Sequence, residues 1–229
     1  MFLITGSGRS GTSAVAQLLH EAGLSVGHDL LEPDEHNAEG YFEERMVIMI
    51  NDAILKAAGI GEWFTTATRE RIREAAVQYV DYMRDQVQVA TPVWKDPRFS
   101  WTLEAWLEMF PEPPRIIVCL RSPAEVVAST LAYFAQAGND AEAAVKHVWR
   151  TQYERLLEII AEFGLDAICV EYAALHADPQ RAAAPLARFV GRPLDVRTVR
   201  RDLRHHAVPI PDDLVELYER VRGLGTAAV

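Results

Sequence analysis

Short apolar runs alternate along this chain with longer segments in which apolar residues recur at helical spacing. The short runs, typical of buried strands, cover Phe2–Thr5, Pro92–Trp94, Arg115–Leu120 and Asp166–Val170. The periodic segments predict helices over Ser10–Ala22, Glu43–Ala58, Thr68–Val89, Phe99–Phe110, Pro123–Ala137, Asp140–Phe163, Asp178–Val190 and Pro211–Val221. Buried strands that alternate with long helices predict a single α/β domain over residues 1–229, with a central parallel β-sheet flanked by helices.

Three segments depart from this pattern. The stretch His28–Gly40 is polar and rich in turn-forming residues, so we expect a loop. Residues Arg192–His206 are basic and irregular, and Gly223–Val229 are expected to fray. In a parallel sheet of this kind, ligands bind beyond the carboxyl ends of the strands. We therefore expect the functional residues directly after the predicted strands.

The net charge of the chain disfavours polyanionic partners. Lys and Arg number 23 and Asp and Glu number 33, which gives a net charge of −10. We expect no nucleic-acid or membrane partner, because neutralisation of phosphates supplies most of that affinity. The two cysteines, Cys119 and Cys169, lie in apolar strand runs and provide neither a disulfide framework nor zinc-ligand spacing. With no basic leader and no run of membrane-spanning length, a cytoplasmic location is expected.

A glycine-rich loop, Gly6–Ser13, joins the first predicted strand to the first helix. Gly6 and Gly11 have the separation of a phosphate-binding P-loop, in which glycine lets backbone amides point at an anion. A nucleotidase loop carries a lysine where this chain has Thr12, and the cation here is Arg9. We therefore expect a phosphate site that requires no metal. Its residues are Gly8, Arg9, Ser10, Gly11, Thr12 and Ser13.

A second candidate phosphate site follows the strand Arg115–Leu120. Arg121 stands at the strand end, where a magnesium-binding Asp would be expected in a kinase, and Ser129 comes eight positions later. An arginine offers permanently charged, fork-like recognition of phosphate oxygens. A surface ion pair is the alternative for Arg121. Its position beside a P-loop favours a phosphate contact shared with the Ser129 hydroxyl.

Together these segments resemble the PAPS-dependent sulfotransferase family, whose donor is 3′-phosphoadenosine 5′-phosphosulfate (PAPS). The loop motif R/K-S-G-T-T/S matches Arg9–Ser13, and the motif R-x-P-x-x-x-x-x-S matches Arg121–Ser129. Three further segments resemble a bacterial branch of that family: Asn37–Glu43 with its G-Y-F-E, Trp94–Arg98 with its K-D-P-R, and Leu203–His206. The resemblance implies a P-loop NTPase-like three-layer fold, PAPS as the donor and PAP, the desulfated nucleotide, as the product.

The resemblance also implies roles for individual residues. The loop from Gly8 to Ser13 would hold the 5′-phosphosulfate, and Arg121 with Ser129 the 3′-phosphate. Lys95 would lie near the sulfuryl group and, with Arg9, stabilise the leaving oxygen. Arg204, with Arg200 and Arg201, is interpreted as closing over the 3′-phosphate side, a solvated basic face being the alternative.

The general base is less well defined, because Asp96-Pro97 replaces the histidine that follows the lysine in many relatives. The candidates are Glu43 and Glu39, with His36 behind them. The aromatic pair Tyr41-Phe42 predicts apolar surroundings that suit a base at Glu43. Alternatively, Glu43 starts the following helix, where carboxylates are favoured. Asp96 and Arg98 are expected to pair with each other and fix their loop.

Two other functions remain as alternatives. A small-molecule P-loop kinase would need the loop lysine and a metal-binding acid, and a non-catalytic nucleotide-binding module would account for the missing histidine. For the sulfotransferase we expect a small-molecule, sugar or natural-product acceptor with a hydroxyl or an amine. Candidate pocket residues are Trp63, Phe64, Tyr133 and Phe134, with core packing as the alternative for at least half of them. The acceptor's identity and the oligomeric state are not predicted, and one histidine of the pair His205-His206 is interpreted as contacting the nucleotide or the acceptor loop.

Overall fold

The computed structural model describes residues 1–34, 37–60, 64–89, 91–134, 140–199 and 208–225. Its strands form one parallel sheet in the order β2-β1-β3-β4, with Phe2 opposite both Val93 and Arg115. The predicted fold class is therefore confirmed, and the strand bounds differ from the predicted ones by one residue at most. The strands are β1 (Phe2–Thr5), β2 (Val93–Lys95), β3 (Arg115–Leu120) and β4 (Ala167–Glu171).

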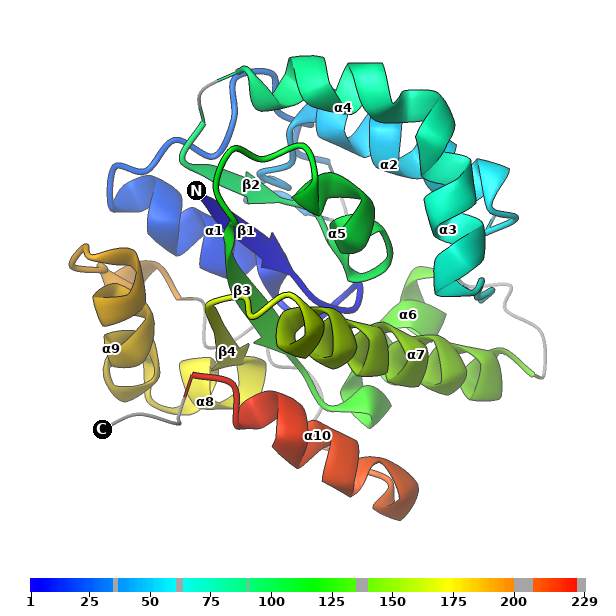
Figure 1. The fold of residues 1–229 in the computed structure, drawn as a ribbon. Helices are drawn as coiled ribbons and strands as arrows, with labels where there is room; N and C mark the ends of the chain where they lie inside the picture. Colours follow the sequence, from blue (N-terminus) through cyan, green and yellow to red (C-terminus); the bar gives the residue numbers. More distant parts are fainter. Residues whose placement is uncertain (35–36, 61–63, 90, 135–139, 200–207, 226–229) are drawn as a thin grey trace.

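Helices cover the two faces of this sheet (Figure 1). None of those described is both long enough and apolar enough to cross a bilayer. The α-helices are α1 (Thr12–Glu21), α2 (Arg45–Ala57), α3 (Arg69–Ala76), α4 (Val80–Val87), α5 (Phe99–Leu107), α6 (Pro123–Tyr133), α7 (Ala141–Glu162), α8 (Tyr172–Ala177), α9 (Pro179–Val190) and α10 (Val215–Arg222). Short 3-10 helices are η1 (Val77–Tyr79), η2 (Val196–Thr198) and η4 (Asp212–Leu214).

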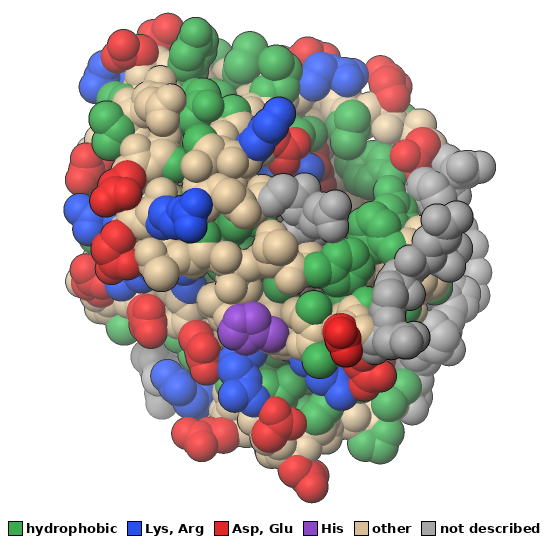
Figure 2. All heavy atoms as spheres, turned by 90° about the vertical axis from the view of Figure 1, so that its right-hand side faces the viewer, with side chains coloured by type: hydrophobic (Ala, Val, Ile, Leu, Met, Phe, Trp, Pro, Cys, Tyr) green, Lys and Arg blue, Asp and Glu red, His purple; other side chains and the backbone are tan. Residues whose placement is uncertain are grey.

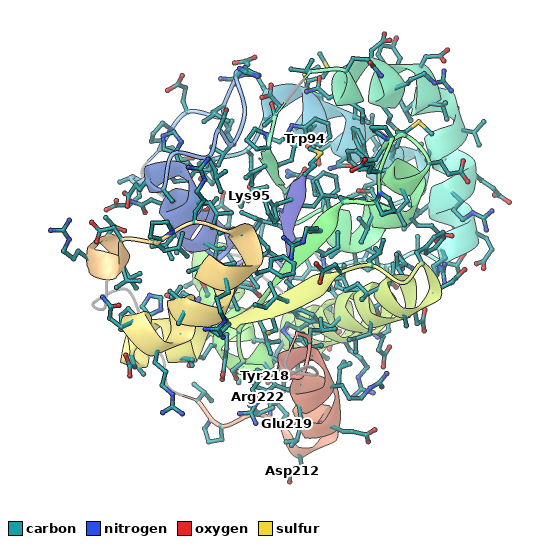
Figure 3. The ribbon with its side chains drawn as sticks, turned by 60° about the vertical axis from the view of Figure 1, so that its left-hand side comes forward. Trp94, Lys95, Asp212, Tyr218, Glu219 and Arg222 are labelled. Atoms are coloured by element: carbon teal, nitrogen blue, oxygen red, sulfur yellow. The ribbon has the colours of Figure 1, made fainter. Side chains whose placement is uncertain are left out.

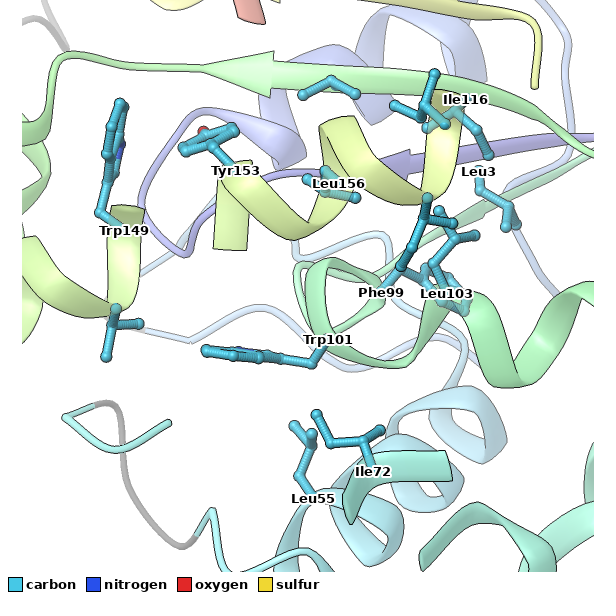
Figure 4. Packing of buried hydrophobic residues seen from close by; sticks show 14 of the residues in the cluster. Leu3, Leu55, Ile72, Phe99, Trp101, Leu103, Ile116, Trp149, Tyr153 and Leu156 are labelled. Carbon is cyan, nitrogen blue, oxygen red and sulfur yellow. The ribbon is translucent and has the colours of Figure 1, made fainter. Parts of the chain in front are cut away.

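Alternate residues of the strands face two separate hydrophobic clusters, which makes the fold three-layered. Leu3 and Ile116 belong to the cluster formed with α2, α3, α5, α7 and α10. Ile4 and Ile117 belong to the other, formed with α1, α8 and α9. This alternation follows from the two-residue period of a strand. Figure 4 shows Tyr153 of α7 lying within the first cluster, alongside residues of the sheet.

Two local predictions are wrong. The single helix predicted over Thr68–Val89 is interrupted by η1, so that α3 packs on α5 and α2 while α4 packs on α2. The predicted fraying does not hold for the described residues of the tail, because the Leu224 carbonyl accepts a hydrogen bond of 3.2 Å from the Cys169 amide. That amide lies on the outer edge of β4, where a backbone donor needs a partner. Helix α8, which directly follows β4, was not predicted.

Candidate active site

The loop after β1 adopts a conformation that requires glycine at two positions. Gly6 has φ of 149° and Gly11 has φ of 85°, both in the region that favours glycine. A Cβ atom at Gly6 would lie 2.3 Å from the Cys119 carbonyl oxygen, and one at Gly11 would lie 2.4 Å from the Tyr172 ring. The loop therefore presses directly against the end of β3 and against α8. Helix α1 begins at Thr12, two residues later than predicted, because the loop continues through Gly11.

We expect Gly11→Ala to weaken nucleotide binding by at least about tenfold, because the Tyr172 ring or the loop must shift to admit the methyl group. Gly23→Ala is the matched control, since Gly23 has φ of 82° and open space around the same atom. Both variants pay the left-handed backbone cost of ~1–2 kcal/mol. Calorimetric titration with PAP and urea unfolding separate the two effects. Equal PAP affinities in the two variants would contradict the inferred role of the close contact.

The hydroxyl of Tyr153, on α7, holds the glycine loop against the end of β3. Its hydroxyl lies 2.6 Å from the Cys119 carbonyl oxygen, 3.3 Å from the Ser7 amide nitrogen and 3.1 Å from Ser10 Oγ. Burial raises the pKa of Tyr153 above its ordinary value, so the hydroxyl remains protonated at neutral pH. The sequence gives no sign of this role, because a tyrosine on the apolar face of a helix is normally part of the core.

The two arginines of the predicted phosphate sites lie close together. Arg9 has a left-handed φ of 65°, and its Nε donates to Ser129 Oγ at 3.0 Å. Arg121 is buried, donates from Nη1 to the Arg9 carbonyl at 3.0 Å and from Nε to Glu125 at 3.1 Å, and stacks over the Tyr172 ring. Ser129 therefore contacts Arg9, and Arg121 supports the backbone of the loop. Both phosphate motifs line one cavity.

Lys95, the last residue of β2, forms a buried ion pair with Glu43. Its Nζ lies 2.5 Å from Glu43 Oε1 and 3.2 Å from Ser13 Oγ, and the two residues are 2% and 5% exposed. Figure 3 shows Lys95 and its neighbour Trp94 on different sides of the strand. Arg98 Nη1 lies 3.4 Å from the other Glu43 oxygen. The prediction of apolar surroundings for Glu43 is therefore wrong, because the cations Lys95 and Arg98 flank its carboxylate.

Glu43 also does not start a helix, since α2 begins at Arg45 with Glu44 at its N-cap. The Glu44 carboxylate instead accepts hydrogen bonds from the His28 and Asp29 amides, at 2.7 and 3.4 Å. Phe42, directly before Glu43, has φ of 56°, an uncommon conformation for a bulky residue. Unusual backbone of this kind is often found at functional sites.

Asp96 and Arg98 pair as expected, at 3.0 Å. Asp96 also accepts a hydrogen bond of 2.9 Å from Asn51 Nδ2. The side-chain oxygen of Asn51, Oδ1, accepts hydrogen bonds from Thr102 Oγ1 and Trp106 Nε1, both 2.8 Å long. Burial lowers the pKa of Arg98, but the nearby carboxylates outweigh this effect and raise it above its ordinary value. The sequence signal for Asn51, which we missed, is a polar residue on the apolar face of α2.

Two cavities meet at this site. The first, the loop cavity, has a volume of about 570 Å³ and is lined by the glycine loop, Lys95, Arg121 and Ser129. The second cavity has a volume of about 780 Å³ and lies between α2, α5, α6 and α7. Figure 2 shows hydrophobic side chains bordering a hollow on the face of the molecule turned toward the viewer. Among the described residues, the two cavities share five lining residues, which are Gly8, Tyr41, Glu43, Pro97 and Tyr133.

The other predicted site residues are distributed as follows. Glu39 lines the loop cavity, where its carboxylate lies 3.5 Å from Gln17 Nε2. Phe64 and Phe134 pack against each other, with ring centroids 5.6 Å apart. Within the described ranges, no group of three or more His, Cys, Asp and Glu side chains is placed to hold a metal ion. His36, Trp63, Arg200, Arg201, Arg204, His205 and His206 lie outside the described residues.

Tyr41 lies where the two cavities meet and donates a hydrogen bond of 2.8 Å to Asp34. Burial and the neighbouring Asp34 carboxylate raise the pKa of Tyr41 to about 12. The phenol is therefore protonated at neutral pH. Among the residues with a described placement, Glu43 is the carboxylate that lines both cavities.

Comparisons with known proteins concern the family and the fold of the chain. The model of the sulfotransferase family matches residues 2–196. The chain is similar to the sulfotransferase domain from the Synechococcus PCC 7002 olefin synthase, with 15% identity, a TM-score of 0.50 and coverage of 100% of this chain and 88% of that one. It is also similar to the sulfotransferase domain from the curacin biosynthetic pathway, with 16% identity, a TM-score of 0.50 and coverage of 98% and 90%. These likenesses show the fold. No curated protein matches the chain.

Proposed function

We propose that this chain, which belongs to the sulfotransferase family, transfers a sulfuryl group from PAPS to a hydroxyl or amine of a small acceptor. The observation that carries the proposal is the position of Glu43. Its carboxylate contacts Lys95 in the loop cavity and also lines the second cavity. A transfer reaction between two bound molecules needs such a junction, with a charge-stabilising group on one side and a base within reach of the other.

The loop cavity suits a nucleotide with phosphates at both ends. Although the chain carries a net charge of −10, the cations Arg9, Lys95 and Arg121 line this cavity in the part of the chain that the structure describes. The backbone of the glycine loop and the start of α1 favour an anion at the 5′ side. We assign Arg121 and Ser129 to the 3′-phosphate. When bound, PAPS supplies an activated sulfuryl group that needs no metal for its transfer.

The residues at the junction then have separate tasks. Glu43 accepts the proton of the acceptor hydroxyl or amine, while Lys95 Nζ places positive charge beside the developing negative charge of the leaving oxygen. Ser13 Oγ, 3.2 Å from Lys95 Nζ, and Arg98, 3.4 Å from Glu43, hold the pair in place. Glu39 is the second candidate base. It lines the loop cavity but not the second cavity, which favours Glu43.

The second cavity suits an uncharged acceptor. Its walls include the apolar side chains of Leu55, Trp101 and Val148. Glu32 and Asp34 lie among the lining residues and would repel an anionic acceptor. A neutral alcohol, phenol or amine with an apolar body is therefore the acceptor class that we propose.

Transfer of label from ³⁵S-PAPS to a panel of neutral alcohols, phenols and amines tests this function. We expect label in the product and stoichiometric release of PAP with at least one of these classes, in the presence of EDTA. A parallel incubation with γ-³²P-ATP and Mg²⁺ tests the kinase alternative. Transfer of ³²P in place of ³⁵S would overturn the proposal in favour of a kinase. Tight PAP binding without transfer of either label would favour a non-catalytic module.

A further inference from the structure

We propose that Gln152 is a specificity-determining residue that binds a carboxamide group of the acceptor, remote from the atom that receives the sulfuryl group. This inference rests on the proposed function and names the substrate class of the same site. Gln152 lines the second cavity and is 6% exposed. Its Oε1 is buried without a hydrogen-bond partner among the residues that the structure describes. A buried polar atom without a hydrogen-bond partner is unfavourable, so a ligand group that satisfies it is favoured.

The position of Gln152 on α7 places it in the wall of the second cavity. Val145, Val148 and Gln152 recur at helical spacing, lie on one face of α7 and all line this cavity. Trp149 and Tyr153 belong to the same hydrophobic cluster as Val145 and Val148, but they are not among the residues that line the cavity. An apolar residue at position 152 would complete the apolar stripe of α7, so a glutamine there introduces a polar group into the part of the wall that α7 forms.

The surroundings of Gln152 select a neutral, amphipathic ligand. Val126 and Trp101 line the same cavity and suit an apolar ligand body. Of the charged side chains that line it within the described parts of the chain, four are acidic (Glu32, Asp34, Glu43, Asp52) and two are basic (Lys56, Arg98). Arg98 is already paired with Asp52, Asp96 and Glu43. This balance disfavours a carboxylate or phosphate at the polar end of the ligand.

A carboxamide matches the side chain of Gln152 in both directions. The glutamine amide offers one carbonyl acceptor and two N–H donors, and a ligand carboxamide presents the complementary set. The inferred acceptor thus has three parts: a hydroxyl or amine that reaches Glu43, an apolar middle against Val126 and Val148, and a carboxamide at Gln152. A site that is built to hydrogen-bond a ligand group discriminates strongly against an analogue that lacks this group.

The probe is a homologous series of straight-chain ω-hydroxy carboxamides, each paired with an isostere in which an isopropyl group replaces the carboxamide. Calorimetry with and without PAP measures the affinity of both members of each pair. The test compares the wild-type protein with Gln152→Leu, which has nearly the same volume. Gln180→Leu is the control, because Gln180 is an exposed glutamine on α9.

We expect the wild-type protein and Gln180→Leu to bind one amide at least about tenfold more tightly than its isostere. Gln152→Leu should lose this preference while its urea-unfolding midpoint stays the same or rises. A missing preference at every chain length, or a preference that survives in Gln152→Leu, would overturn the inference. Binding does not require turnover, so a failure of sulfuryl transfer with the amide preference intact would count against the proposed function alone.

Discussion

Lys95→Met is expected to lower the rate of sulfuryl transfer by ~10²–10³-fold, because it removes a buried positive charge beside the proposed position of the sulfuryl group. Methionine keeps most of the side-chain volume, and the neighbours Glu43 and Ser13 remain in place. Nucleotide affinity should change only several-fold, since Arg9 and Arg121 still line the loop cavity. Single-turnover transfer from ³⁵S-PAPS measures the rate, and calorimetry measures the affinity for PAP.

Lys146→Met is the control for the loss of one lysine charge, because Lys146 pairs with Glu142 on the outer side of α7. This variant should transfer sulfate at the wild-type rate. Transfer by Lys95→Met at the control rate would show that Lys95 does not stabilise the leaving oxygen. A large loss of PAP affinity with an unchanged rate at saturating PAPS would assign Lys95 to binding alone.

Glu43→Gln is expected to lower the transfer rate by ~10²–10⁴-fold, the range for loss of a general base. The amide keeps the shape of the side chain and can still accept a hydrogen bond from Lys95, but it does not take a proton from the acceptor. KM for the acceptor should change little, because the apolar walls of the second cavity remain. The rate constants come from ³⁵S transfer with saturating PAPS.

Glu39→Gln is the comparison that separates the two candidate bases. Because Glu39 does not line the second cavity, its replacement should affect the rate by a few-fold at most. A large loss in Glu39→Gln together with near-normal transfer by Glu43→Gln would reverse the assignment. In that case the ion pair between Glu43 and Lys95 would hold the lysine in position rather than transfer a proton.

Features that depend on local sequence were the ones predicted. The four strands are short apolar runs, and the P-loop follows from the spacing of Gly6 and Gly11 on either side of Arg9. The backbone of that loop has positive φ angles at Gly6 and Gly11, which glycine tolerates. The spacing of these two glycines in the sequence is therefore enough to predict the loop. The Asp96–Arg98 pair was predicted for the same reason, since its partners are two residues apart.

Features that depend on packing between distant segments were missed. Tyr153 reaches a loop 146 residues earlier, and Asn51 reaches Asp96, 45 residues later. Both side chains lie on helical faces that are otherwise apolar, so periodicity assigns them to the core. The apolar surroundings predicted for Glu43 from the preceding aromatic pair are wrong, because Lys95, 52 residues away, contacts its carboxylate.

The break at η1 has a similar origin. The segment Thr68–Val89 contains neither glycine nor proline, and its local pattern is that of one continuous helix. Packing of α3 against α5 and of α4 against α2 bends the chain between them. Tertiary contacts therefore override a regular local pattern at this position.

The most direct test of the central claim is a calorimetric comparison of PAP, ADP and ATP with Mg²⁺ as ligands. PAP and ADP carry two phosphates each and differ only in where the second one lies. We predict that PAP binds without a metal and at least about tenfold more tightly than ADP. Arg121→Ala and Ser129→Ala should each reduce this preference. Equal affinity for PAP and ADP, or tighter binding of ATP with Mg²⁺, would contradict a donor site for PAPS.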